Sequence, residues 1–131
     1  MLRERHMDKV VHFEIPFDNK QRAMKFYSQS FGWQLTEMPE MKYVIARTVD
    51  VDERQIPKES GAINGGLFER PREAPHPAIY VGVTSVDATI KKVGAAGGKV
   101  VTAKTPISGM GAYARIADTE GNIVGLFESQ R

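Results

Sequence analysis

The chain has 131 residues, of which 41% are hydrophobic and 26% are charged, with a formal net charge of +2. This length and composition are those of one compact globular domain with a core of its own. Because the chain has no cysteine, disulfides, thiolate zinc sites, iron–sulfur clusters and a cysteine nucleophile are excluded.

Charge and hydropathy also limit the partners. Lysine and arginine are scattered among aspartate and glutamate, so no basic stripe of the kind that follows nucleic-acid phosphates is present. No apolar run approaches the roughly 20 residues that span a bilayer, and the N-terminus lacks the apolar core of a signal peptide. We therefore expect a cytoplasmic protein that binds neither membrane nor nucleic acid.

The first half of the chain predicts a strand, a helix and three strands. The strand at 9–16 places His12 and Glu14 on one face, and the helix after it can be capped by Asp18 or Asn19 and ends at Gly32. The next strands are expected at 33–38, 42–49 and 61–69, with an exposed charged loop at 50–60.

The second half repeats this order after a proline-rich linker at 70–77. A strand at 78–83 precedes a helix that starts with a capping box at Thr84 and Asp87, and strands follow at 99–105, 112–118 and 123–128. Residues 106–111 are expected to form a flexible loop that lies over the cavity as a flap.

A short internal repeat supports the same division. Residues 63–69 read Ile-Asn-Gly-Gly-Leu-Phe-Glu and residues 122–128 read Asn-Ile-Val-Gly-Leu-Phe-Glu, so that Gly66 and Gly125 begin the same tetrapeptide. Duplication of one unit is the simplest reading of such a repeat. The sequence predicts an α+β fold in which two βαβββ modules, at about 9–69 and 78–128, form a curved mixed eight-stranded sheet around a cavity.

Several motifs then point to a family. They are Val11-His12-Phe13-Glu14-Ile15, Phe26-Tyr27, Phe31-Gly32-Trp33, Val86-Asp87-Ala88-Thr89-Ile90, Ala95-Ala96-Gly97-Gly98-Lys99-Val100 and Asp118-Thr119-Glu120-Gly121-Asn122. Over residues 9–128 the chain resembles the vicinal oxygen chelate superfamily, which includes glyoxalases, bleomycin resistance proteins and extradiol dioxygenases. The resemblance implies a single glyoxalase-like domain over 1–131 that binds a small molecule and forms a homodimer.

In that superfamily four protein positions hold a divalent metal, which the substrate chelates through two neighbouring oxygens. Carried over to this chain, the four positions fall on His12, Gly66, Ala78 and Gly125. Only His12 can bind a metal, and one imidazole does not hold an ion alone. We therefore expect no cofactor and disfavour a divalent metal.

Two glutamates near the repeated glycines are possible replacements. Glu69 and Glu128 lie three residues beyond Gly66 and Gly125, and an odd spacing on a strand sends them to the opposite face. The sequence therefore predicts that neither glutamate restores the metal site.

His12 and Glu14 are the candidate catalytic residues. They share a strand face, so Glu14 can orient the imidazole of His12 for proton transfer. The alternatives are an interior histidine left from an ancestral metal site and an ion pair at the mouth of the cavity.

Six further residues are candidates for the ligand pocket. Tyr80 and Tyr113 can form aromatic walls or core, Arg115 can bind a carboxylate or phosphate or lie at a solvated edge, and Asn64 can orient a ligand through its amide. The pair Gly66 and Gly125 can open the cavity floor or allow close packing between the modules.

Three functions remain open at this point. The leading hypothesis is a glyoxalase-like small-molecule-binding protein acting as a metal-independent lyase or isomerase. A second is a protein of the bleomycin-resistance type that sequesters a drug or metabolite without catalysis. A third is a metal enzyme that completes its site from a second chain or from His76.

Overall fold

The protein is described here by a computed structural model, in which residues 6–130 are described. These residues divide into two compact units. One unit is Val11–Ile79, and the other holds the described residues up to Val10 and from Tyr80 onward. The linker expected at 70–77 therefore belongs to the first of these units.

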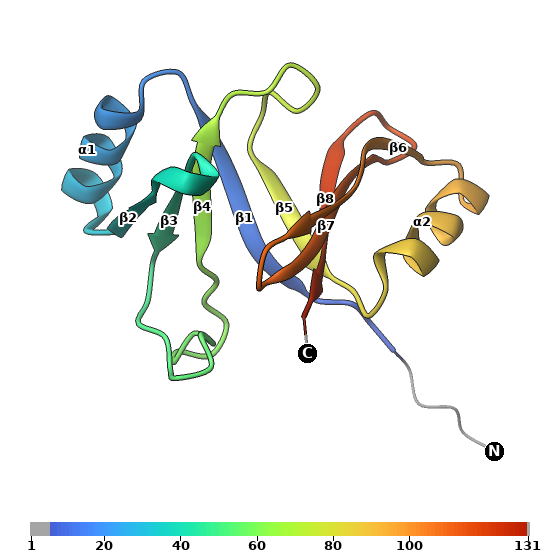
Figure 1. Ribbon diagram of the computed structural model, residues 1–131, viewed down its shortest axis with the longest axis horizontal. Helices are drawn as coiled ribbons and strands as arrows, with labels where there is room; N and C mark the ends of the chain where they lie inside the picture. Colours follow the sequence, from blue (N-terminus) through green and yellow to red (C-terminus); the bar gives the residue numbers. More distant parts are fainter. Residues whose placement is uncertain (1–5, 131) are drawn as a thin grey trace. The chain divides into compact units, whose positions relative to one another are not determined.

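The unit Val11–Ile79 carries the first βαβββ module (Figure 1). Its elements are β1 (Val10–Phe17), α1 (Lys20–Phe31), β2 (Gln34–Met38), the short 3₁₀ helix η1 (Pro39–Met41), β3 (Tyr43–Arg47) and β4 (Gly65–Glu69). The strand order is β2-β3-β4-β1, with β1 parallel to β4 and the other pairs antiparallel.

The second module has the same topology. Its elements are β5 (Ala78–Gly82), α2 (Val86–Ala95), β6 (Lys99–Ile107), β7 (Gly111–Ala117) and β8 (Ile123–Ser129). The strand order is β5-β8-β7-β6, with β5 parallel to β8. The expected α+β class, with two βαβββ modules and eight strands in mixed pairing, is confirmed.

Strand register shows that the repeated glycines occupy equivalent places. Gly66 of β4 lies opposite Glu14 of β1, and Gly125 of β8 lies opposite Tyr80 of β5. Glu14 and Tyr80 are thus counterparts in the two modules.

Side-chain caps fix where each helix begins. Asn19, one of the two expected caps, accepts a hydrogen bond at 2.9 Å from a first-turn amide of α1, and Gly32 ends that helix with a φ of 70°. The capping box expected at Thr84 is wrong, because the cap of α2 is Ser85, whose hydroxyl accepts from the Ala88 amide at 3.0 Å.

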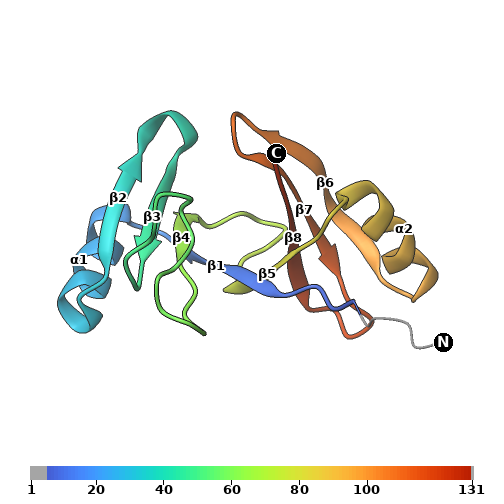
Figure 2. The same ribbon diagram turned by 90° about the horizontal axis from the view of Figure 1, so that it is seen from below.

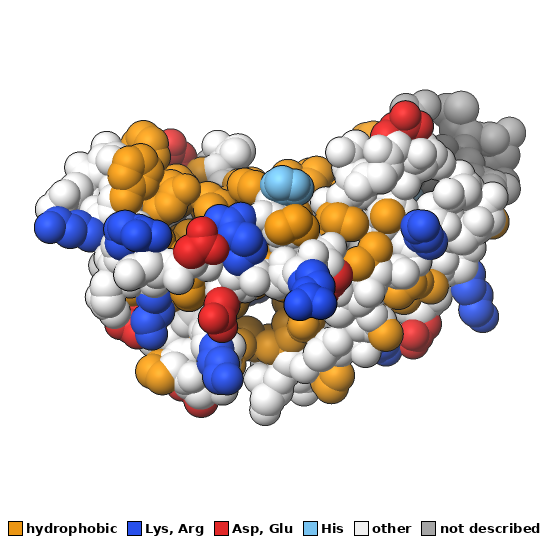
Figure 3. Space-filling model, turned by 90° about the horizontal axis from the view of Figure 1, so that it is seen from above, with side chains coloured by type: hydrophobic (Ala, Val, Ile, Leu, Met, Phe, Trp, Pro, Cys, Tyr) orange, Lys and Arg blue, Asp and Glu red, His pale blue; other side chains and the backbone are white. Residues whose placement is uncertain are grey.

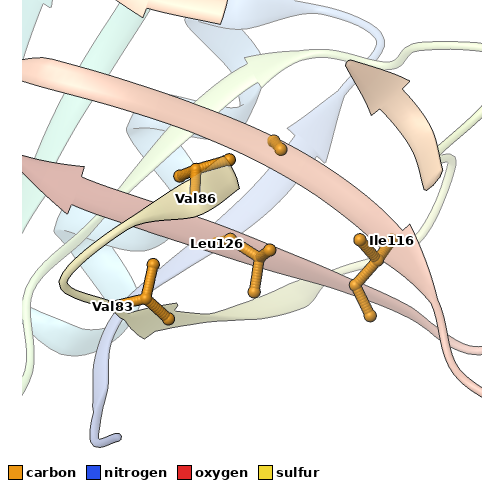
Figure 4. Packing of buried hydrophobic residues seen from close by; sticks show 5 residues of the cluster. Val83, Val86, Ile116 and Leu126 are labelled. Carbon is orange, nitrogen blue, oxygen red and sulfur yellow. The ribbon is translucent and has the colours of Figure 1, made fainter. Parts of the chain in front are cut away.

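Helix α2 covers its own sheet. It contacts β6, β7 and β8, and it lies beside them in both ribbon views (Figure 2). The core beneath it is formed by a cluster of small aliphatic residues (Figure 4), namely Val83, Val86, Ala114, Ile116 and Leu126. Burial of each larger member contributes about 1.5–3 kcal/mol.

Helix α1 is packed differently. It contacts β2 and has no buried residue, and its rings Phe26 and Phe31 are 54% and 61% exposed. Figure 3 shows hydrophobic side chains at the surface over this helix. The two repeats therefore share a topology, but only the helix of the second carries a buried residue, Val86.

Two loops differ from the expectation. Strand β4 begins at Gly65 rather than at 61, because the Asn64 amide oxygen accepts from the backbone of Thr48 at 2.7 Å and of Val49 at 3.1 Å and closes the preceding loop.

The flexible flap expected at 106–111 is also wrong, since β6 and β7 leave only a three-residue turn between them. The Gln130 amide ties this turn to the last strand by donating to the Met110 carbonyl at 3.0 Å.

Arg70 fastens the linker to the start of α1. Its Nε and Nη2 donate to the two carboxylate oxygens of Asp18 at 2.9 and 3.3 Å, and its Nη1 donates to the Pro75 carbonyl. The hydrogen bond from Arg70 holds the pKa of the Asp18 carboxyl below its usual range.

Both helices that the structure describes are too short and polar to cross a membrane.

Candidate functional site

Three polar side chains meet in the first module. His12 and Glu14 lie on β1 and Tyr43 begins β3. The Tyr43 hydroxyl lies 2.7 Å from His12 Nε2 and donates to Glu14 Oε2 at 2.9 Å. His12 Nε2 is itself 3.6 Å from Glu14 Oε2, so the expected pair is in place, with a tyrosine hydroxyl bonded to both members.

Gly66 makes room for this tyrosine. A Cβ atom built on Gly66 would lie 1.8 Å from the Tyr43 hydroxyl and 2.0 Å from Cζ, far inside van der Waals contact. Any side chain at position 66 would therefore displace the ring. The glycine is required by close approach of a ring within its own module, and its role in a ligand pocket stays a prediction.

Exposure differs along the trio. The His12 side chain is 31% exposed and that of Glu14 is 12% exposed. A solute can therefore reach the imidazole, while the carboxylate lies deeper. A carboxylate held this deeply is rarely placed without a hydrogen-bonded or functional role.

An apolar hollow lies on the same unit and shares only Glu14 with the trio. It has a volume of about 410 Å³ and is lined by Phe13, Glu14, Ile15, Trp33, Pro77, Ala78 and Ile79. His12 and Tyr43 do not line it. Since Phe13 and Ile15 alternate with His12 and Glu14 along β1, the hollow belongs mainly to the opposite face of that strand, and we do not place the chemistry there.

A second polar group forms in the other module, from residues expected in the pocket. Arg115 is only 9% exposed, and its Nε donates to the Tyr80 hydroxyl at 3.0 Å. Its guanidinium carbon lies 5.3 Å from the centre of the Tyr113 ring, a cation–π contact, and its Nη1 lies 3.5 Å from the Thr102 hydroxyl. The alternative that Arg115 lies at a solvated edge is wrong.

Gly125 makes room for the Tyr80 ring in the same way that Gly66 makes room for the Tyr43 ring. Its Cβ would lie 2.2 Å from the Tyr80 ring, which is 3% exposed. The predicted residues therefore lie in two groups, one in each unit. In each group a tyrosine ring packs directly against a glycine.

The remaining candidates have structural partners. The Asn64 amide also donates to the Val49 carbonyl at 3.3 Å, so its hydrogen bonds close a loop, and its role toward a ligand stays a prediction. Glu128 Oε1 accepts from the Val86 amide at 2.7 Å and so caps α2 on the helix side of the sheet, as its strand parity predicted.

Known proteins share this architecture. A family model described as Bleomycin resistance protein-like N-terminal matches residues 9–48. A probable lactoylglutathione lyase from Vibrio parahaemolyticus serotype O3:K6 is 26% identical over 127 residues, which cover 94% of this chain and 92% of the relative. A Vibrio cholerae protein of the same name is 25% identical with the same coverage.

Solved structures agree on the fold. A hypothetical protein from Bacillus halodurans C-125 matches with a TM-score of 0.65 at 17% identity, covering 96% of this chain and 97% of its own. A Streptomyces coelicolor methylmalonyl-CoA epimerase in complex with 2-nitronate-propionyl-CoA matches with a TM-score of 0.64 at 17% identity, covering 96% of this chain and all of its own, 100%.

The family model, the relatives and the solved structures all fall in the vicinal oxygen chelate superfamily, and this chain is similar to them. The four positions expected from the sequence to correspond to that superfamily's metal ligands are His12, Gly66, Ala78 and Gly125, and three of these lack a donor side chain.

The structure explains why nearby residues do not complete a metal set of that kind. Tyrosine rings fill the space that ligands at positions 66 and 125 would need. Within residues 6–130 no three histidine, aspartate or glutamate side chains come together in a way that could hold a metal ion. The donor set therefore does not fit the superfamily's metal, and metal independence itself stays a prediction.

Sequence reasoning missed Tyr43. It is the first residue of β3, whose sequence has no distinctive motif, and it lies 31 residues from His12, so neither spacing nor motif connects the two. The available signal was the glycine at 66: a glycine inside a strand indicates close approach of another group, and an aromatic residue on the neighbouring strand was a candidate for that group.

Proposed function

We propose that this chain is a glyoxalase-like small-molecule-binding protein that acts as a lyase or isomerase by proton transfer, without a bound metal. The observation that carries the proposal is the hydrogen-bonded trio of His12, Tyr43 and Glu14, with an imidazole that solute can reach. A neutral imidazole accepts a proton, and a carboxylate 3.6 Å away stabilises the resulting positive charge.

The relatives suggest the substrate class. Their names give lactoylglutathione and methylmalonyl-CoA as substrates. Both compounds are thioesters with an acidic C–H bond beside a carbonyl group. We propose that the ligand of this chain is also such a carbon acid, from which His12 removes the proton.

The test is deuterium incorporation by chelator-treated protein in D₂O, using both thioesters and followed by mass spectrometry. Loss of a general base typically costs 10²–10⁴-fold in rate. We expect His12→Gln to lose about this much in rate, and His76→Gln, at an exposed position of the linker, to lose nothing. Equal exchange by wild type and His12→Gln would contradict the assignment of the base.

Sequestration without catalysis is a second candidate. It is favoured by the match of residues 9–48 to the bleomycin resistance protein-like model. A ligand at about 100 times its Kd raises stability by about 2.7 kcal/mol, which a thermal-shift screen detects. A stabilising ligand that is recovered unchanged and without deuterium supports sequestration.

We also propose a homodimer in which a second copy covers the aromatic face of α1. Phe26, Tyr27, Phe31 and Trp33 form a continuous ring cluster there, and two of these rings are more than half exposed. Large exposed apolar patches on globular proteins are typical of interaction sites. The cytoplasmic location expected from the sequence stays a prediction.

A further inference from the structure

Arg47, the last residue of β3, lies on the same face of the first sheet as His12. Burial alternates along β3, and Tyr43 and Arg47 are two of its three partly exposed residues. Both therefore point to one face of the strand. On that face the Tyr43 hydroxyl is bonded to His12. Arg47 and His12 thus point to the same side of the sheet.

The strand register brings Arg47 level with His12. Gly65 of β4 lies opposite both Phe13 of β1 and Ala46 of β3. One residue closer to the loop between β3 and β4, the next row holds His12 in β1 and Arg47 in β3. Neighbouring strands are about 4.8 Å apart, so two strand spacings separate these backbones by about 10 Å. Side chains at this separation on one face can contact the two ends of a single small molecule.

A loop residue in a rare conformation holds the guanidinium of Arg47. The side-chain oxygen Oε1 of Gln55 accepts from Arg47 Nη2 at 2.8 Å. Gln55 has a φ of 68°, in the left-handed region that residues other than glycine rarely adopt. Asp52 fixes this turn, because its carbonyl accepts from the Gln55 amide at 2.9 Å and its carboxylate accepts from the Ile56 amide at 3.0 Å. Backbone strain of this kind is concentrated at functional sites.

Most donors of this guanidinium remain available to a ligand. Arginine has five N–H donors in a planar fork that matches a carboxylate or a phosphate, and the bond to Gln55 uses one of them. Within residues 6–130 Arg47 forms no ion pair. Its side chain is partly exposed, so an anion in solution can reach it. An anionic group of a ligand therefore complements this side chain in both charge and shape.

We infer that Arg47 binds an anionic group of the substrate, a carboxylate or a phosphate, and that Gln55 is a positioning residue for its guanidinium. This inference rests on the proposed function, to which it adds a substrate class. The substrate is a carbon acid that also carries an anionic group, with its acidic C–H bond at His12 and its anion at Arg47.

The same loop supplies a matched control. Arg54 is exposed and lies next to Gln55 in the sequence. Arg54→Gln therefore removes the same charge from the same loop and leaves the Arg47 fork in place. A second variant, Gln55→Gly, removes the amide that holds Arg47. Glycine adopts a φ of 68° readily, so this variant loses the hydrogen bond without adding backbone strain.

The test is an NMR titration of the full chain, labelled with ¹⁵N, at low ionic strength. The probes are acetate, inorganic phosphate and neutral acetamide. The signals followed are the backbone amides of Thr48 and Val49, which come directly after Arg47 and are held by the Asn64 side chain, so they report on the site in every variant. We expect shifts that saturate with acetate, with phosphate or with both, and no saturation with acetamide. Saturation by only one of the two anions identifies which group Arg47 binds.

The variants give the expected size of the effect. Hydrogen bonds to a charged group are strong enough that Arg47→Gln should raise the Kd of the anion about 10–100-fold. Gln55→Gly should raise it about 2–10-fold, because the guanidinium is then no longer held. Arg54→Gln should leave the Kd unchanged.

Three results would overturn the inference: no saturation of the wild-type protein with either anion, equal shifts with acetamide, or equal weakening by Arg47→Gln and Arg54→Gln. The first two need no variant, so they are decisive even if Arg47→Gln folds poorly. An unchanged Kd in Gln55→Gly would overturn the positioning role. Because the titration involves no thioester and no turnover, its failure leaves the deuterium assay of the proposed function standing, and failure of that assay leaves the anion titration valid.

Discussion

Replacing Gly66 by alanine would place a methyl group where the Tyr43 ring lies. The new Cβ would be 1.8 Å from the hydroxyl and 2.0 Å from Cζ, so the ring must move. Movement of the ring breaks its hydrogen bonds to His12 and to Glu14. One added methyl group thus tests both the packing of the site and its hydrogen bonding.

The expected loss has two parts. Forcing a methyl group into a packed site costs about 1–3 kcal/mol, and each lost hydrogen bond costs about 0.5–1.5 kcal/mol net. Since the partly exposed His12 side chain lets water replace part of the lost bonding, we expect Gly66→Ala to reduce the free energy of unfolding by about 2–4 kcal/mol. Urea denaturation with a slope of about 1.5–2 kcal/mol/M would show this as a midpoint about 1–3 M lower.

Gly94→Ala is the control. A Cβ on Gly94 meets nothing within 4 Å, and this residue lies inside α2. Gly94→Ala should therefore raise the free energy of unfolding by about 0.5–1 kcal/mol, because alanine has the higher helix propensity. If Gly66→Ala matched Gly94→Ala in stability, the glycine would not be needed to seat Tyr43, and our account of its role would be wrong.

Three further predictions follow from the described contacts. Hydrogen bonds from the backbone amides of Asn122 and Glu120 lower the pKa of Asp118, so its contribution to stability is present above the unfolded pKa of about 3.9 and is lost as pH falls through the folded pKa. The urea midpoints of wild type and Asp118→Asn should therefore converge on acidification from about pH 6 to 3. A constant gap between the two midpoints would refute this. Glu128→Ala should lower the free energy of unfolding by about 1–2 kcal/mol, because it removes the carboxylate that caps α2. Glu69→Ala, which removes an exposed carboxylate, should change the urea midpoint little. Equal effects of the two substitutions would contradict the capping role of Glu128. Phe31→Asp should convert the dimer to a monomer, as measured by light scattering, whereas Val100→Asp, at an exposed position of β6, should leave the dimer intact. A monomeric wild-type protein would refute the proposed dimer.

The order of strands and helices could be predicted from the sequence because it depends on local patterns. Strand alternation, the Asn19 cap and the Gly32 stop each act over a few residues, and each appears where it was expected. The repeat from Gly66 and Gly125 correctly indicated two modules of one topology. The late start of β4 was not predictable, because it depends on the Asn64 side chain folding back over 15 or 16 residues.

The site could be predicted only in part. Strand parity placed His12 and Glu14 on one face and sent Glu128 to the other, since parity is a property of a single strand. Tyr43 and Tyr80 each lie two strands away in the sheet from the residue that they bond, Glu14 and Arg115, so no rule of spacing connects the members of either pair. The reason for the repeated glycines appeared only when the rings above them were seen.

Metal content tests the central claim most directly. Elemental analysis of untagged protein, purified without chelator, should find no stoichiometric metal, because tyrosine rings occupy the space that ligands at positions 66 and 125 would need. One Ni, Zn, Mn or Fe per chain that is lost in His12→Gln would contradict the account, and would show that this chain binds the superfamily's metal through a different set of ligands.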